Sequence, residues 1–219
     1  MRTVRRLYPV VAVLVLLAAV AAAPATSSPS HQAGDGEPCA NMEPGVQCAP
    51  GNNRQTVGGA EKVPHTGWPR ISGVLAKALD SDDHTLVGGP DNDELLAHHG
   101  SDTVSGGGGH DVLWGDWDPR ANNTRQRDVL RGGEGNDFIY PSHGTTRVDG
   151  GPGRDHVWAF YGKGTIDCGA GANDTARVRE NGAFRVRNCE RVLHFCQFGS
   201  NSDGSCKKPG ETLARRARL

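Results

Sequence analysis

Aliphatic residues recur every nine positions through the middle of the 219-residue chain. These positions are Leu86, Leu95, Val104, Leu113, Leu130, Ile139, Val148, Val157 and Ile166, with one interruption after Leu113. An aspartate precedes most of them by two places, and glycines fill much of the stretch between. A flexible linker would not keep such a register, so the pattern predicts a repeat architecture.

The segment before the repeats, residues 67–80, has a different apolar spacing. Its sequence is GWPRISGVLAKALD, with apolar side chains at 71, 74, 75, 78 and 79. This spacing predicts a short amphipathic helix. A stack of repeats has two open ends that need covers, so we expect this helix to form an N-terminal cap.

Three segments repeat the same nine-residue motif, residues 106–114, 132–140 and 150–158. Each has glycine in the first, second and fourth places, aspartate in the sixth and an aliphatic residue in the eighth. Residues 88–96 and 97–105 are partial copies. At the interruption, Asp128 follows Asp111 by one position less than two repeats. This spacing suggests that one coil is a residue short, through a looped-out or tightened turn.

These segments resemble the hemolysin-type calcium-binding repeat, also called RTX, with the consensus G-G-x-G-x-D-x-U-x in which U is apolar. The resemblance covers about residues 79–176. It implies an all-β fold, a parallel β-roll (β-solenoid) in which each repeat supplies a turn and a short strand. Consecutive strands would lie in opposite sheets, and the alternation along each strand sends only the eighth residue inward.

The resemblance also implies Ca²⁺ between turns that stack one coil, or two repeats, apart. The candidate ligands are Asp93, Asp102, Asp111, Asp128, Asp137, Asp155 and Asp174, together with Gly88, Gly106, Gly107, Gly109, Gly132, Gly133, Gly135, Gly150, Gly151 and Gly153. Two aspartates and several turn carbonyls would supply the oxygen ligands that Ca²⁺ requires. The alternative is that each aspartate only accepts hydrogen bonds from nearby turn amides.

The two-repeat spacing sorts the aspartates into pairs. Asp93 with Asp111, and Asp137 with Asp155, are separated by two full repeats and are the strongest pairs. The pair Asp111 and Asp128 is one position short of this spacing, the pair Asp155 and Asp174 is one position over it, and both are weaker because each crosses an irregularity. Asp102 faces the opposite edge and has no good partner at this spacing.

The N-terminus carries the features of an export signal. Arg2, Arg5 and Arg6 precede an apolar run over residues 10–23, and Ala23-Pro24-Ala25 forms an A-x-A cleavage site. Residues 1–25 are therefore expected to be a signal peptide, with an uncleaved anchor as the alternative. The run is short for a membrane span, so we expect no stable membrane insertion once the signal is removed.

Six cysteines follow, and an even number after a signal peptide favours disulfides. The simplest of the 15 possible pairings joins nearest neighbours: Cys39 with Cys48, Cys168 with Cys189, and Cys196 with Cys206. We expect a flexible N-terminal arm over 26–66, a capped roll over 67–191 including a disulfide-bonded C-terminal cap, and a disulfide loop with a basic tail over 192–219. Such Cys-containing tails resemble those of small exported RTX-type proteins of actinobacteria.

Composition narrows the function. A formal net charge of -1 gives no sign of nucleic-acid binding. Two common hydrolase motifs, H-E-x-x-H and G-x-S-x-G, do not occur in the sequence, and we expect no enzymatic activity. We expect a secreted or envelope protein in which calcium stabilises a structural or adhesive module.

Two other interpretations stay open. Tyr140 and Trp158 are separated by two repeats and could form an outer aromatic ladder for a cell-wall or other extracellular glycan, in a binding protein or a carbohydrate-active enzyme, unless another segment covers them. The second is a zinc cluster among the five histidines near the repeats, although they show no recognisable zinc spacing and exposed polar positions are their expected role. They are His98, His99, His110, His143 and His156.

Overall fold

The structure is a computed structural model that describes residues 39, 42–53, 67–118, 120, 124–196, 199–200 and 206. The chain divides into two units, residues 1–32 and 33–219, and the described residues all belong to the second. The expected signal peptide and most of the basic tail lie outside the described residues. Within these ranges, no helix has the length and apolar character needed to cross a membrane.

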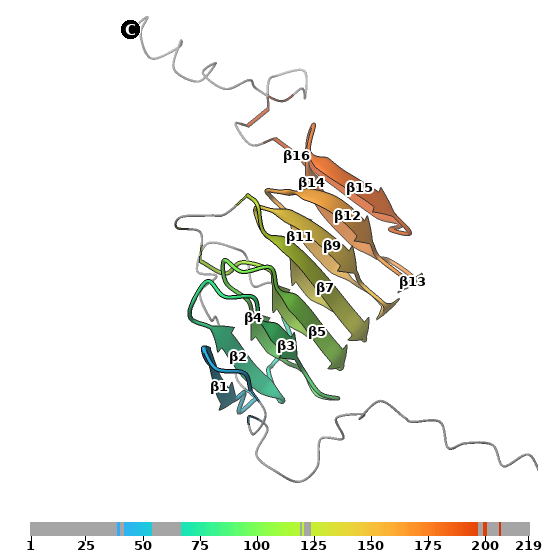
Figure 1. Ribbon diagram of the computed structural model, residues 1–219. Helices are drawn as coiled ribbons and strands as arrows, with labels where there is room; N and C mark the ends of the chain where they lie inside the picture. Colours follow the sequence, from blue (N-terminus) through green and yellow to red (C-terminus); the bar gives the residue numbers. More distant parts are fainter. Residues whose placement is uncertain are drawn as a thin grey trace, which may run out of the picture. The chain divides into compact units, whose positions relative to one another are not determined.

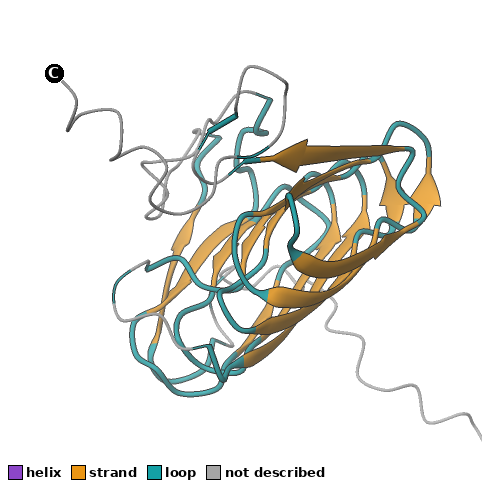
Figure 2. Cartoon of the chain, turned by 90° about the horizontal axis from the view of Figure 1, so that it is seen from above, coloured by secondary structure: helices purple, strands orange, loops and turns teal. Residues whose placement is uncertain are grey.

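The described residues form strands joined by turns, and none of them is helical (Figure 2). The strands are β1 (Val46–Pro50), β2 (Val74–Ala78), β3 (Thr85–Val87), β4 (Glu94–Leu96), β5 (Thr103–Gly108), β6 (Val112–Trp114), β7 (Arg127–Glu134), β8 (Phe138–Tyr140), β9 (Thr145–Asp149), β10 (Pro152–Gly153), β11 (His156–Ala159), β12 (Lys163–Asp167), β13 (Ala170–Gly171), β14 (Thr175–Arg179), β15 (Ala183–Arg187) and β16 (Arg191–Phe195).

The strands wind into a parallel β-roll, which confirms the expected fold. One sheet has the order β1-β2-β4-β6-β8-β11-β14-β16 and the facing sheet has the order β15-β12-β9-β7-β5-β3. The main strands from β2 to β16 thus alternate between the two sheets, and they stack coil upon coil in Figure 1. The short strands β10 and β13 pair with each other at one edge, where successive turns stack.

The nine-residue aliphatic pattern fills the space between the two sheets. In one sheet Leu95 is in register with Leu113, and Leu113 with Ile139. In the other sheet Val104 is in register with Leu130. All of these side chains are fully buried. Each coil therefore adds at least one inward aliphatic residue from each sheet, and burial of this column is the main apolar contribution to stability.

Residues 67–80 do not form the predicted helical cap. Their central part is strand β2, which pairs in parallel with β4 and antiparallel with β1. Val74, Ala76 and Ala78 are buried while Leu79 is 55% exposed, which is the period-two pattern of a strand. The apolar spacing fits a helix or a strand, and pairing with β4 selects the strand because it completes the first coil. Strand β1 then covers the open edge of β2.

The interruption in the repeat is a lengthened turn and not a shortened coil. Leu113 and Leu130 lie in opposite sheets. One repeat of sequence is enough to carry the chain from one sheet to the other, yet almost two repeats separate these residues. The extra residues form an insert between β6 and β7, which we define as residues 115–126. The expected pairing of Asp111 with Asp128 is therefore wrong, because these residues lie at opposite edges of the roll. A residue count along the chain could not distinguish the two cases.

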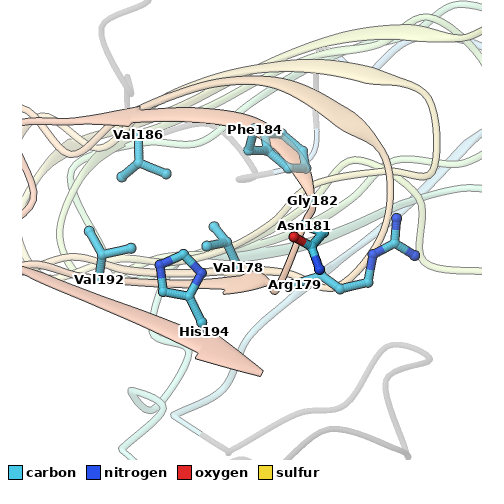
Figure 3. A pocket seen from close by; sticks show the side chains of 8 residues that line it. All are labelled: Val178, Arg179, Asn181, Gly182, Phe184, Val186, Val192 and His194. Carbon is cyan, nitrogen blue, oxygen red and sulfur yellow. The ribbon is translucent and has the colours of Figure 1, made fainter. Parts of the chain in front are cut away.

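Three disulfides follow the nearest-neighbour pairing, Cys39–Cys48, Cys168–Cys189 and Cys196–Cys206. The first ties the segment before β1 to that strand, so part of the expected flexible arm belongs to the sheet. The second joins two successive turns near the C-terminal end. Beyond it, β14, β15 and β16 border a hollow of about 400 Å³, toward which Phe184 and Val192 project from facing strands (Figure 3).

Candidate metal centre

One edge of the roll carries a stacked column of glycine- and aspartate-rich turns, which we call the Gly/Asp edge. Its turns are residues 88–93, 106–111, 132–137, 150–155 and 168–174. Each turn leads from the six-stranded sheet into the eight-stranded sheet and ends on an aspartate. These aspartates, Asp93, Asp111, Asp137, Asp155 and Asp174, are all at most 1% exposed. Buried carboxylates in such a column require compensation.

One carboxylate oxygen of each aspartate is used in a ladder along this edge. The backbone amide of Asp93 donates to Oδ1 of Asp111 at 2.8 Å, and the amide of Asp137 donates to Oδ1 of Asp155 at 2.9 Å. Both of the pairs separated by two full repeats therefore lie in adjacent coils. The amide of Asp155 also donates to Oδ1 of Asp174, 19 residues later, at 2.7 Å.

The other carboxylate oxygen is mostly left without a protein partner. Oδ2 of Asp111, Asp137, Asp155 and Asp174 is buried and accepts no hydrogen bond from the described residues. Asp93, in the first turn, differs because its Oδ2 accepts from the amide of Gly89 at 2.7 Å. A buried carboxylate oxygen without a hydrogen-bond partner is unfavourable, and a repeated row of such oxygens is suited to bind a cation.

The first glycine of each turn keeps a small space open beside these oxygens. A Cβ on Gly132 would stand closer than 3.0 Å both to Oδ2 of Asp137 and to the carbonyl oxygen of Gly150 in the next coil. The same holds at Gly106, with Oδ2 of Asp111 and the carbonyl of Gly132. Side-chain and main-chain oxygens of neighbouring coils therefore converge on a place that only glycine leaves clear.

The electrostatics of the column favour a bound cation. Burial raises the pKa of Asp111 to about 8, and the neighbouring Asp137 and Asp93 carboxylates add to this effect. Burial likewise raises the pKa of Asp155 to about 8 and that of Asp137 to about 6. Ca²⁺ prefers carboxylate and carbonyl oxygens, tolerates irregular geometry and would compensate these charges. The residues present on the Gly/Asp edge therefore fit calcium.

The opposite edge holds a shorter column that sequence spacing missed. The amide of Asp102 donates to Oδ1 of Asp128, 26 residues later, at 3.0 Å. Oδ1 of Asp102 in turn accepts from the amide of His84 at 2.8 Å. Burial raises the pKa of Asp102 to about 7 and that of Asp128 to about 6. The partner of Asp102 was hidden because the insert adds residues between the two coils.

This second column stops in the next coil. Thr146 stands in the aspartate place, and its hydroxyl is 3.0 Å from that of Ser142. A neutral hydroxyl pair replaces the carboxylate there, so the charged column at this edge has two members and the one at the Gly/Asp edge has five.

Two further features of the Gly/Asp edge were not predicted. Glu190 ends the column, because its carboxylate accepts from the amide of Asp174 at 2.8 Å. Beside the aspartates runs a second ladder, in which Asn92 accepts from the amide of His110 at 2.7 Å and Asn136 accepts from the amide of Arg154 at 2.9 Å. A polar residue in the fifth place of the motif was the available signal for this ladder.

The outer aromatic residues are partly covered. Tyr140 is only 2% exposed, and its hydroxyl accepts a hydrogen bond from the Trp68 indole at 2.8 Å. Trp158 is half-buried, with the guanidinium of Arg177 at 4.8 Å from its ring centroid. The segment that precedes β2 thus covers Tyr140, and the outer aromatic ladder is not exposed along its whole length.

Residues 81–118 and 124–142 match the family model of the RTX calcium-binding nonapeptide repeat, in four copies. The gap between the two matched ranges falls inside the insert. No curated protein and no solved structure matches the chain at a significant level. The matched repeats, the β-roll and the Gly/Asp edge agree with one another: the chain carries hemolysin-type (RTX) calcium-binding repeats, and the β-roll that contains them is a calcium-binding structural module.

Proposed function

We propose that the chain is an exported protein in which calcium, bound along the Gly/Asp edge, stabilises a structural or adhesive module outside the cell or in its envelope. The observation that carries this proposal is the row of buried Oδ2 atoms on Asp111, Asp137, Asp155 and Asp174 without a protein partner among the described residues. Four adjacent coils share this arrangement, so one ligand chemistry accounts for all of them.

In this proposal the aspartates and glycines have different roles. Oδ2 of Asp111 and of Asp137, with the carbonyl oxygens of Gly132 and Gly150, would hold ions between coils. Bound Ca²⁺ would neutralise the buried carboxylates and cross-link neighbouring turns. The Oδ1 ladder would keep each carboxylate oriented whether or not an ion is bound, because its donors are backbone amides.

Export and a structural role have separate support. Three disulfides suit an oxidising compartment, where extracellular Ca²⁺ is abundant enough for sites of about 10⁻⁴ to 10⁻³ M affinity. The signal-like residues 1–25 provide a route to it. An adhesive or structural role needs only a stable surface, which the stacked coils provide.

Circular dichroism and calorimetry of the chain without residues 1–25 test the calcium role. We expect the strand signal and the unfolding temperature to fall when a chelator removes Ca²⁺, and to recover on re-addition. Asp137→Asn should weaken calcium binding at least about tenfold, because a lost interaction with a charged group costs about 1.5–3 kcal/mol. Asp82→Asn, at an exposed turn position, is the control. A spectrum and melting curve indifferent to chelator would contradict the proposal.

A glycan-binding role has weaker support because Trp68 covers Tyr140. Of the two rings expected to form the ladder, only Trp158 is partly exposed, and it lies beside Arg177. Binding of the protein to a glycan array or to purified cell wall, lost in Trp158→Ala, would support this role. Equal binding by the variant would remove Trp158 from it.

A further inference from the structure

Histidines and carboxylates from separate segments meet at the edge opposite the Gly/Asp edge. His98 and His99 lie in the turn after β4, and Asp116 and Asp118 lie in the insert after β6. The insert is fixed here by main-chain and side-chain contacts: the amide of Trp117 donates to the carbonyl of Ala97 at 3.0 Å, and the Trp117 indole donates to that of Ala78 at 3.0 Å. Asp116 and Asp118, two residues apart, therefore approach the same pair of histidines.

Three of these side chains have the arrangement of a metal-binding group. One ligand atom each from His98, His99 and Asp118 lies within 4.8 Å of the other two. Nε2 of His98 is 3.9 Å from Oδ2 of Asp118. Ligand atoms around tetrahedral Zn²⁺ are about 3.4 Å apart, as bond lengths of about 2.0–2.1 Å require. Small side-chain rotations would close the difference.

The three side chains are more deeply buried than those of an ordinary surface cluster. The side chains of His98 and His99 are each 12% exposed and that of Asp118 is 11% exposed. Nδ1 of His98 is buried and has no hydrogen-bond partner among the described residues. Imidazoles placed in this way, out of water and beside a carboxylate, lack the solvation of ordinary surface histidines.

Asp116 is placed to accept a hydrogen bond from the ring nitrogen of His99 that does not bind the metal, as is usual for metal-binding histidines. Its side chain is fully buried, and one carboxylate oxygen is 3.3 Å from Nδ1 of His99. Its Oδ1 accepts no hydrogen bond from the described residues. A carboxylate that holds Nδ1–H leaves Nε2 of the same ring to bind a metal. His143, from the next coil, approaches the same carboxylate at 4.0 Å.

We propose that His98, His99 and Asp118 form a second metal site, for Zn²⁺ or a similar divalent transition metal, with Asp116 as the positioning residue for His99. Imidazole nitrogens suit Zn²⁺, whereas Ca²⁺ takes oxygen ligands. The two edges of the roll are thus chemically distinct, with an oxygen-only column on one and an imidazole group on the other. This site goes beyond the calcium role and does not depend on it.

A neighbouring cation competes for the carboxylate of this site. Nη2 of Arg120 is 2.8 Å from Oδ2 of Asp118. The Arg120 side chain is 84% exposed, so its displacement into water costs little. Removal of this competitor should therefore raise zinc affinity, whereas removal of the carboxylate should lower it.

The test is a titration of the untagged chain with Zn²⁺, and separately Co²⁺, in saturating Ca²⁺. We expect one tight Zn²⁺ equivalent by calorimetry and the visible absorption of tetrahedral Co²⁺ with nitrogen ligands. His99→Asn and Asp118→Asn should abolish the absorption band, and Asp116→Asn should weaken zinc binding about 10- to 100-fold. His194→Asn, at a half-exposed histidine ion pair, should bind as the parent does.

The variants also separate a folding defect from a lost site. Calcium-dependent circular dichroism of each variant reports whether the roll is intact, and it reports on the proposed function independently of zinc. If His99→Asn does not fold, Asp118→Asn and Arg120→Gln still test the site. Asp118→Asn should lower zinc affinity and Arg120→Gln should raise it. No zinc binding above that of a His98→Ala/His99→Asn variant, or equal binding by Asp118→Asn and Arg120→Gln, would overturn the proposal.

Discussion

The backbone amide of Asp111 donates a hydrogen bond at 2.9 Å to Oδ1 of Asp137, a residue 26 positions later. The neighbouring rungs of the same ladder join residues 18 apart. The column of carboxylates is therefore continuous across the insert, which leaves from the opposite edge of the roll. The ladder depends on which turns stack, and not on a fixed count of residues.

The continuity of this ladder predicts that the insert is dispensable for the roll. Deletion of residues 116–123 would shorten the separation of Asp111 and Asp137 from 26 positions to the 18 of the neighbouring rungs. We expect the shortened protein to keep its strand content and its calcium stoichiometry, because surface loops tolerate changes in length. It should lose the Zn²⁺-binding capacity that we propose. Circular dichroism with calcium titration checks the first outcome, and collapse of the calcium response would show that the insert is part of the roll.

The space beside the first glycine of each turn predicts a sharp effect of one methyl group. Gly132→Ala would place a Cβ against Oδ2 of Asp137 and the carbonyl of Gly150. We expect a loss of about 1–3 kcal/mol in stability from the added volume, together with weaker calcium binding.

The matched control for this substitution is Gly89→Ala. A Cβ at Gly89 would meet no atom within 4 Å, and its backbone is outside the left-handed region. Chemical denaturation and calcium calorimetry on both variants measure the contrast. Equal effects of the two substitutions would contradict a functional space at Gly132.

The repeat and its core could be read from the sequence, but the first coil and the insert could not. Leu95, Leu113 and Ile139 keep the period of nine, so the roll was predictable from them. Ile71 and Val74 fit helical and extended periods alike, and pairing with β4, a non-local contact, selects the strand.

The site was predictable to a different degree at each edge. The Gly/Asp edge repeats a motif, so Asp93 could be aligned with Asp111, and Asp137 with Asp155, by spacing alone. The contact of Asp111 with Asp137 could not, because the insert lies between them in the sequence. The proposed zinc group has no such signal, because His99 and Asp116 meet only through the path of the insert. Tyr140 could be placed on the outer face, but the cover that Trp68 provides comes from 72 residues away.

Acid should stabilise the calcium-free roll relative to neutral pH. Asp111 and Asp155 have an ordinary pKa of 3.8, which burial raises to about 8 in the folded protein. Between these values the folded state binds more protons than the unfolded state, so stability falls as pH rises from about 4 to about 8. Each such group contributes up to about 1.4 kcal/mol per pH unit in this window.

Calcium should reverse this dependence, because Ca²⁺ and protons compete for the same carboxylates. We expect calcium affinity to increase from pH 5 to pH 8, with proton release on binding that calorimetry in two buffers of different ionisation enthalpy can measure. Denaturation midpoints in chelator and in Ca²⁺ over the same pH range complete the test. A calcium-free protein that becomes steadily more stable toward pH 8 would contradict the raised pKa values.

The disulfide between Cys168 and Cys189 should stabilise the last coils in particular. It closes a loop with a sequence separation of 21, for which chain entropy gives about 3 kcal/mol. We expect Cys168→Ala/Cys189→Ala to lose about that much and to exchange amide hydrogens faster in β14–β16. The coils from β4 to β8 should keep their protection, since stacked repeats contact mainly their neighbours. Uniform loss of protection would mean that the roll unfolds as one unit.

Calcium binding along the Gly/Asp edge is tested most directly by a crystal structure grown in Ca²⁺, with anomalous diffraction to locate the ions. We expect anomalous peaks between successive turns of this edge, each within bonding distance of Oδ2 of Asp111, Asp137 or Asp155. Peaks confined to other surfaces, or an ordered roll without any peak beside these oxygens, would contradict it.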